Sequence, residues 1–205
     1  MYLANDEIVN ALLLLVYNFF IIFFVSRKVY KRFGTYMARK TIHFLSAGVS
    51  VLLAPFVFKD VYLPVLLAGL MILLTLAGHV WRLYGWFQVK GNYADVYFNV
   101  MCTLLLALFW YYNVSIGVLS CLFMAWGDGI TGIVRNIIYK RRTKGIWGNV
   151  AMFPVCAFLG YFILGYVGVV GGIFSCIVEK FEIVDDNISI PLGSAVLMTM
   201  LRLLK

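Results

Sequence analysis

The sequence predicts an all-α membrane protein, a polytopic bundle of about seven to eight transmembrane helices with its N-terminus outside. Three observations predict this fold. The 205 residues are 63% hydrophobic and only 13% charged, and their mean hydropathy of +0.94 is higher than soluble domains of this size usually reach. Apolar stretches of about 20 residues, enough to cross a hydrocarbon core of roughly 30 Å, follow one another closely. The basic residues cluster in alternate connections between these stretches.

Hydrophobicity places the spans in chain order. The first, Ile8–Val25, follows Asp6 and Glu7 rather than a basic segment, so we interpret it as a retained helix and not as a signal peptide. The other uninterrupted spans are Thr41–Phe58, Val61–Trp81, Asn92–Tyr112, Val114–Val134 and Ile188–Leu204. We therefore expect residues 1–205 to form one integral membrane catalytic domain without a separate soluble domain.

The segment Gly148–Val178 does not fit a single span, because it contains 31 residues without a charge. One helix of that length would measure about 46 Å. Its glycines permit a bend and close helix packing. We therefore predict two short or tilted helices with a turn near Gly165–Gly168.

The distribution of positive charge gives the predicted orientation. All of the 17 Lys and Arg residues except Lys59, Arg202 and Lys205 fall on one side of the predicted topology. Cytoplasmic loops carry such an excess, so the net charge of +8 indicates membrane orientation and no nucleic-acid partner. The N-terminus is then outside, and three polar clusters lie on the cytoplasmic side.

The first cluster surrounds Asp128, which is the one charged residue in the span Val114–Val134. An ionisable group at membrane depth is costly and usually functional. Gly127 and Gly129 would permit a sharp turn or close approach of a ligand. A helix that begins just after Asp128 would offer free N–H groups to a phosphate. We expect metal or phosphate chemistry here, with a helix N-cap as the alternative.

The second cluster is Arg39, Lys40 and His43, whose spacing places all three on one side of a helix. Arg and Lys suit phosphate oxygens, and His can donate a hydrogen bond or transfer a proton. The alternative is a basic membrane anchor followed by an interfacial His.

The third cluster contains Glu179, Asp185, Asp186 and Asn187. Such oxygen ligands suit Mg²⁺, which keeps water and substrate phosphates in its shell. The alternative is a solvated acidic turn. Together, the three clusters predict a site for a metal ion and a phosphorylated substrate.

Fainter polar patterns occur elsewhere in the chain. Two sets repeat at helical spacing, and each could contact a nucleotide or form hydrogen bonds between helices. They are Asn92-Asp95-Asn99-Thr103 and His79-Arg82-Trp86. The run Lys140-Arg141-Arg142 could bind anionic lipid headgroups or attract a nucleotide.

Four motifs occur in order: Arg39-Lys40-x-x-His43-x(4)-Gly48, Gly127-Asp128-Gly129, Lys144-x-x-x-Gly148-Asn149, and Glu179-x(5)-Asp185-Asp186-Asn187-x-x-x-Pro191. This order resembles the CTP-dependent lipid kinases, which include dolichol kinase, phytol kinase and the CTP-type diacylglycerol kinase. That group is distantly similar to CTP:phosphatidate cytidylyltransferases and CDP-archaeol synthase. The chain departs from the family at Trp147, where a Glu is usual, and mildly at Thr131, where Ala is common.

The resemblance implies Mg²⁺-dependent transfer of the γ-phosphoryl group of CTP to a membrane isoprenoid alcohol of the dolichol or polyprenol type. It implies a metal site formed by Asp128, Glu179, Asp185 and Asp186. The residues expected to bind nucleotide and phosphate are Arg39, Lys40, Lys144, Gly127, Gly129, Gly148 and Asn187. The candidate bases for the alcohol proton are His43, Asp185 and Asp186.

Two other functions stay open at this stage. A cytidylyltransferase that makes a CDP-lipid from a lipid phosphate would use the same nucleotide and metal, although the Arg39-Lys40-x-x-His43 motif favours a kinase. A non-catalytic transporter or lipid-binding bundle would explain Asp95 and Asp128 as a translocation path. It would not explain three polar clusters at one face, and the chain shows no inverted repeat.

Overall fold

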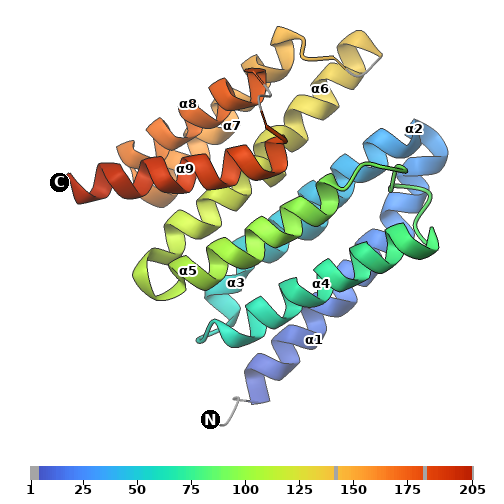
Figure 1. The fold of residues 1–205 in the computed structure, drawn as a ribbon, viewed down its shortest axis with the longest axis horizontal. Coiled ribbons are helices and arrows are strands. Elements are labelled where there is room, and N and C mark those ends of the chain that lie inside the picture. The colour runs from blue at the N-terminus through green and yellow to red at the C-terminus, as the bar shows by residue number, and fades with distance from the viewer. Residues whose placement is uncertain (1–4, 141–142, 182–183, 205) are drawn as a thin grey trace.

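The computed structural model describes residues 5–140, 143–181 and 184–204, and these are almost entirely helical, with no strand (Figure 1). The helices are α1 (Asn5–Phe20), η1 (Ile21–Val25), α2 (Ser26–Thr41), η2 (Ile42–Gly48), α3 (Val49–Val57), α4 (Tyr62–Trp81), α5 (Ala94–Leu122), η3 (Phe123–Asp128), α6 (Gly129–Tyr139), α7 (Ile146–Leu164), α8 (Tyr166–Phe181) and α9 (Asp186–Leu203). The η elements are wider, π-helical turns that join their neighbours.

Within the described residues, four helical runs are long and apolar enough to cross a membrane, namely Asp6–Val57, Tyr62–Trp81, Ala94–Tyr139 and Ile146–Leu164. Large apolar side chains on the outer faces of these runs are exposed, as expected for surfaces that contact lipid rather than water. The helical content and these long apolar helices confirm the predicted all-α fold of the membrane type.

Two of these runs, of 52 and 46 residues, are longer than the roughly 20 residues that cross a membrane once. Each of them reverses direction at a kink inside the run. The first turns at Gly34, whose φ of 81° suits glycine. The Tyr17 hydroxyl then donates to the Leu45 carbonyl at 2.8 Å, which fixes α1 antiparallel to η2. The second turns at Asn113, the one residue inside α5 with non-helical backbone angles. Figure 1 shows both reversals.

The connection predicted between the first two spans is mostly helical. The basic segment Arg27–Arg32 continues the first helix, and Arg39 and Lys40 belong to the second, so only the kink at Gly34 separates them. Lys and Arg are good helix formers, and hydropathy alone cannot distinguish a loop from a helix that extends beyond the hydrocarbon core.

The predicted break in Gly148–Val178 is confirmed, because α7 ends at Leu164 and α8 begins at Tyr166. Gly165 between them has φ 62°. The two helices then pack with their backbones in contact at Gly160 and Gly168, where neither residue leaves room for a Cβ atom. Glycine at these positions therefore lets α8 return along α7.

Adding a methyl group at this contact should destabilise the fold. We expect Gly168→Ala to lower the free energy of unfolding by about 1–3 kcal/mol, because the new Cβ overlaps the backbone at Gly160. The control is Gly69→Ala in α4, where an added Cβ meets nothing within 4 Å. This variant should leave the free energy of unfolding unchanged or raise it by about 0.5–1 kcal/mol. Denaturant unfolding in mixed micelles measures both; equal effects would contradict the close contact.

Candidate functional site

A pocket of about 430 Å³ at one end of the bundle, the polar pocket, contains residues from all three polar clusters. Its charged and polar lining comes from segments far apart in the sequence. These residues are Tyr36, Arg39, Lys40, His43, Asn92, Asp128, Arg135, Thr143, Lys144, Glu179, Asp185, Asp186 and Asn187. The topology places them together because α2, η3, α6 and the start of α9 all meet at this end.

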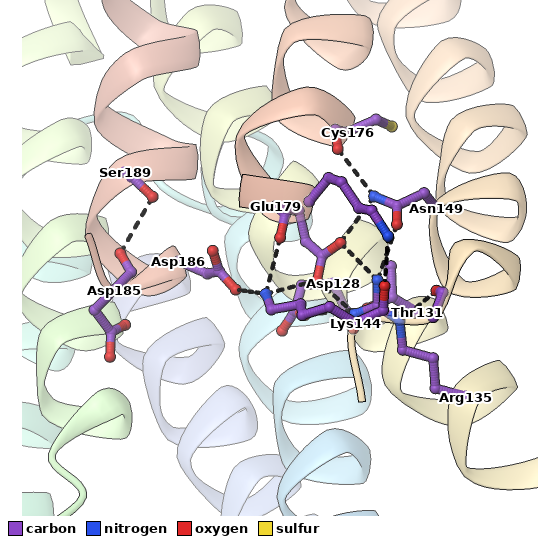
Figure 2. A network of polar contacts seen from close by, with 12 residues as sticks. Asp128, Thr131, Arg135, Lys144, Asn149, Cys176, Glu179, Asp185, Asp186 and Ser189 are labelled. Carbon is purple, nitrogen blue, oxygen red and sulfur yellow. Dashed lines mark hydrogen bonds and ion pairs between the residues drawn. The ribbon is translucent and has the colours of Figure 1, made fainter. Parts of the chain in front are cut away.

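Three carboxylates form the centre of the polar pocket (Figure 2). Asp128 from η3, Glu179 from α8 and Asp186 from the start of α9 each bring one oxygen within 4.8 Å of the others. The three residues are only 9%, 0% and 9% exposed, respectively. Carboxylates this close repel one another unless cations neutralise them, so the cluster suits a divalent metal ion.

Basic side chains neutralise this carboxylate cluster in the structure. Lys40 forms an ion pair with Asp128 and also donates to its backbone carbonyl at 3.1 Å. Lys144 Nζ bridges the other two carboxylates, at 2.9 Å from Glu179 Oε1 and 2.5 Å from Asp186 Oδ2. Each ammonium group thus occupies a position beside the carboxylates that a metal ion would also favour.

Glu179 is the most completely bonded of the three acids. Arg135 binds it with two parallel hydrogen bonds of 2.6 and 3.0 Å, and Asn149 Nδ2 donates to it at 2.9 Å. With Lys144 added, both carboxylate oxygens accept two hydrogen bonds each. In this arrangement Glu179 positions Arg135 and Lys144, so a metal ion would find more open ligands in Asp128 and Asp186.

Asp186 retains binding capacity, since its Oδ1 atom is buried and has no hydrogen-bond partner among the described residues. Burial raises the pKa of Asp186 to about 6, although the hydrogen bond from Lys144 acts in the opposite direction. Burial alone would lower the pKa of Lys144, but its hydrogen bonds to Asp186 and Glu179 outweigh this and raise it. Lys144 is therefore a permanent cation beside a carboxylate that a metal ion would stabilise.

The helix α6 does begin at Gly129, just after Asp128, but it continues directly from η3, so the expected free N–H groups are absent. Asp128 and Gly129 both have helical backbone angles, Asp128 makes no side-chain cap, and the Gly129 N–H donates to the Trp126 carbonyl. The π-helical turn η3 carries the helix through this point, so the backbone neither turns sharply nor offers a free helix N-terminus to phosphate. The Asp128 side chain itself provides the chemistry here.

The three glycines predicted to bind nucleotide do not line the polar pocket. A Cβ on Gly127 would overlap Cys156 and Met152, and one on Gly129 would crowd Phe44. Gly148 lies directly against the guanidinium group of Arg135. These glycines bring helices together around the site rather than facing a ligand.

Asp185 lies at the polar pocket but outside the carboxylate cluster, and its side chain points away from it (Figure 2). Its Oδ1 atom accepts hydrogen bonds from the backbone and side-chain nitrogens of Asn187 at 2.9 and 2.8 Å, which caps α9. The turn chemistry considered for this cluster thus describes Asp185, whereas Asp186 faces the other acids. Asn187 Oδ1 is buried without a partner among the described residues.

His43 and Arg39 connect the polar pocket to a second one. Both also line the apolar pocket, a largely aliphatic cavity of about 140 Å³ between α1, η2, α3, α4 and α5. His43 packs against Phe98 with ring centroids 4.9 Å apart, and its buried Nδ1 atom has no hydrogen-bond partner among the described residues. Arg39 donates to Asn92 at 3.3 Å. These two side chains form the boundary between a charged and an apolar cavity.

Sequence reasoning missed Arg135 and Asn149 as site residues. Arg135 is only 4% exposed, whereas its place among basic residues in the sequence suggests a loop cation that orients the chain in the membrane. One signal was present: Arg135 follows Asp128 by seven residues, two helical turns, and so lies on the same side of the helix. Asn149 offered no comparable signal beyond its place after Gly148.

The fainter polar patterns mostly connect helices. His79 Nε2 contacts Asp95 Oδ1 at 2.9 Å, and Trp86 donates to Ser26 at 2.9 Å. Of the first set, Asn92 alone lines the polar pocket. Arg141 and Arg142 of the basic run lie outside the described residues.

Comparisons with known proteins show no relative: no family model matches the chain, and neither a curated protein nor a solved structure is significantly similar to it. The fold and the site therefore define the class only as a helical protein of the membrane type with a charged pocket beside an apolar one.

Proposed function

We propose that this protein is a Mg²⁺-dependent kinase that transfers the γ-phosphoryl group of CTP to a membrane isoprenoid alcohol. One observation carries the proposal: the polar pocket, which contains the carboxylate cluster and its cations, shares Arg39 and His43 with the apolar pocket. A lipid kinase needs this combination, because its donor is a charged nucleotide and its acceptor is a hydroxyl on an apolar chain. Phosphoryl transfer depends mainly on positioning and on neutralising charge.

Asp128 and Asp186 would hold Mg²⁺, which would neutralise charge on the donor phosphates. Lys40 and Lys144 already lie beside these carboxylates. When Mg²⁺ and nucleotide bind together, the ammonium groups would exchange carboxylate for phosphate oxygens. The ordered motifs that resemble the CTP-dependent lipid kinases support CTP as the nucleotide.

The acceptor hydroxyl would lie at the boundary formed by Arg39 and His43. Its oxygen forms a bond to the γ-phosphorus, the bond from that phosphorus to the β–γ bridging oxygen breaks, and CDP leaves with the electron pair. His43 would take the hydroxyl proton, because its side chain lines both pockets and its Nδ1 atom has no hydrogen-bond partner among the described residues. Arg39 would neutralise charge on the transferred group.

We also propose the topology that places this site in the cytoplasm. The turns at Gly34, Asn113 and Gly165 divide the chain into about eight crossings. Following the positive-inside rule, the N-terminus is outside and the polar pocket faces the cytoplasm. Single cysteines in a Cys-free background, labelled by an impermeant maleimide in intact cells, test this orientation: Lys59→Cys should react and Lys90→Cys should not.

The proposed activity is tested with purified protein in detergent, Mg²⁺ and CTP labelled on its γ-phosphate, with dolichol and geranylgeraniol offered separately. We expect label in the organic phase with CTP, and little with ATP, GTP or UTP. Absence of transfer, with pyrophosphate release when a lipid phosphate is supplied, would assign the protein to the cytidylyltransferases instead. No turnover in either assay would refute both the kinase and the cytidylyltransferase, and a transporter or lipid-binding bundle would then be the function to test.

A further inference from the structure

The apolar pocket differs from an open lipid groove in both its lining and its size. Its polar side chains largely bond with one another: Asn18 donates to Ser50 Oγ at 2.9 Å and accepts from Ser46. Of the other polar wall residues, Thr75 donates to the Met71 carbonyl and Asp95 bonds with His79 and Gln88, so most of the wall offered to a ligand is aliphatic and aromatic, with Arg39 and His43 at one end. A ligand that enters it must place an apolar group inside and its polar group at that end.

The cavity volume limits how much of a lipid can enter. At about 140 Å³, it is close to the volume of an engineered cavity of about 150 Å³ that binds benzene. Only about five or six carbon atoms therefore fit beside the hydroxyl. The rest of a long chain must lie outside, where Leu12 of α1 and Leu66 of α4 present exposed apolar faces.

We infer that the apolar pocket binds the first, hydroxyl-bearing isoprene unit of the acceptor, so that the enzyme selects for this unit and not for chain length. This inference rests on the proposed kinase function. Five carbons with a methyl branch match the cavity volume. The space for this unit lies beside three small wall residues, Ala47, Ala54 and Ala68. The rigid rings of Phe58 and Phe98 form other parts of the wall.

A pocket of this small volume discriminates among the groups that enter it, which are those nearest the hydroxyl. A mismatch of one methylene in an apolar pocket changes kcat/KM by about 10- to 200-fold. Carbon atoms beyond the pocket stay in an apolar environment whether or not the alcohol is bound, so they should have little effect on kcat/KM. We therefore expect geraniol, farnesol and geranylgeraniol to react with kcat/KM values within about threefold of one another when compared at equal mole fraction in micelles, and diacylglycerol at least about 10-fold more slowly.

A variant that fills the apolar pocket with a larger side chain tests whether the isoprene unit binds there. Ala68→Leu adds three carbons to a wall residue of the cavity and should lower kcat/KM for all three isoprenoid alcohols at least about 10-fold. The matched control is Ala107→Leu, an exposed position on α5, which should keep wild-type rates. Binding of a fluorescent CTP analogue with Mg²⁺ should be unchanged in both variants, which shows that the polar pocket is intact.

The outcomes separate this inference from the proposed function. If the wild-type protein phosphorylates no alcohol, the kinase proposal fails. If it phosphorylates isoprenoids, but Ala68→Leu behaves like Ala107→Leu or the rate rises steadily with chain length, the kinase stands and the pocket assignment is overturned.

Discussion

Asp128→Asn should lower phosphoryl transfer to geranylgeraniol by about 10²- to 10³-fold, the effect of removing one strong electrostatic contact from a transition state. The substitution keeps the size of the side chain, which is largely buried, but removes the charge that would bind Mg²⁺. Initial rates measured over a range of Mg²⁺ concentrations should show both a lower maximum and a higher half-saturating concentration. The control is Asp60→Asn, which touches Tyr111 in a different region of the chain and should retain normal rates.

Loss of the ion pair with Lys40 is a rival explanation for this effect, and Lys40→Met separates the two. It also breaks the Lys40–Asp128 pair, but it leaves the carboxylate without a competing ammonium group. We expect Lys40→Met to bind Mn²⁺, a spectroscopic substitute for Mg²⁺, more tightly than the wild type, and Asp128→Asn to bind it more weakly. Equal changes in both variants would rule out Asp128 as a metal ligand.

The sequence was sufficient for those features that depend on local composition. Hydropathy predicted an all-helical chain of the membrane type, and the glycines within one long uncharged segment predicted the break at Gly165. Helical spacing predicted that Arg39, Lys40 and His43 share a side, and all three line the polar pocket.

Features that depend on tertiary packing could not be predicted in this way. The helix continues through Asp128 as a π-helical turn in which Trp126 donates to the Phe44 carbonyl at 2.8 Å, and Gly48 leaves room for the Trp126 ring. Nothing near Asp128 in the sequence specifies this contact with η2. The pairing of Arg135 with Glu179 likewise joins residues 44 positions apart.

Glu179→Met should lower the free energy of unfolding by about 3–5 kcal/mol, the usual cost of leaving a buried charge without its partner. Glu179 is fully buried, and Arg135, which is nearly so, would lose both of its hydrogen bonds to the carboxylate. Arg135→Met should be destabilising for the same reason. Equilibrium unfolding in mixed micelles measures both variants, and stability close to that of the wild type in either would contradict an energetically important pair.

The double variant Arg135→Met/Glu179→Met distinguishes stability from function. Replacing both members of a buried ion pair with apolar groups of similar size is often neutral or stabilising, so the double variant should be more stable than either single variant. It should still transfer phosphate poorly, because Lys144 loses the Glu179 carboxylate at 2.9 Å, although its contacts with Asp186 and with the Glu179 backbone carbonyl remain. A stable but inactive double variant would show that the buried pair serves to position Lys144 at the polar pocket, whereas full activity would limit Arg135 and Glu179 to a structural role.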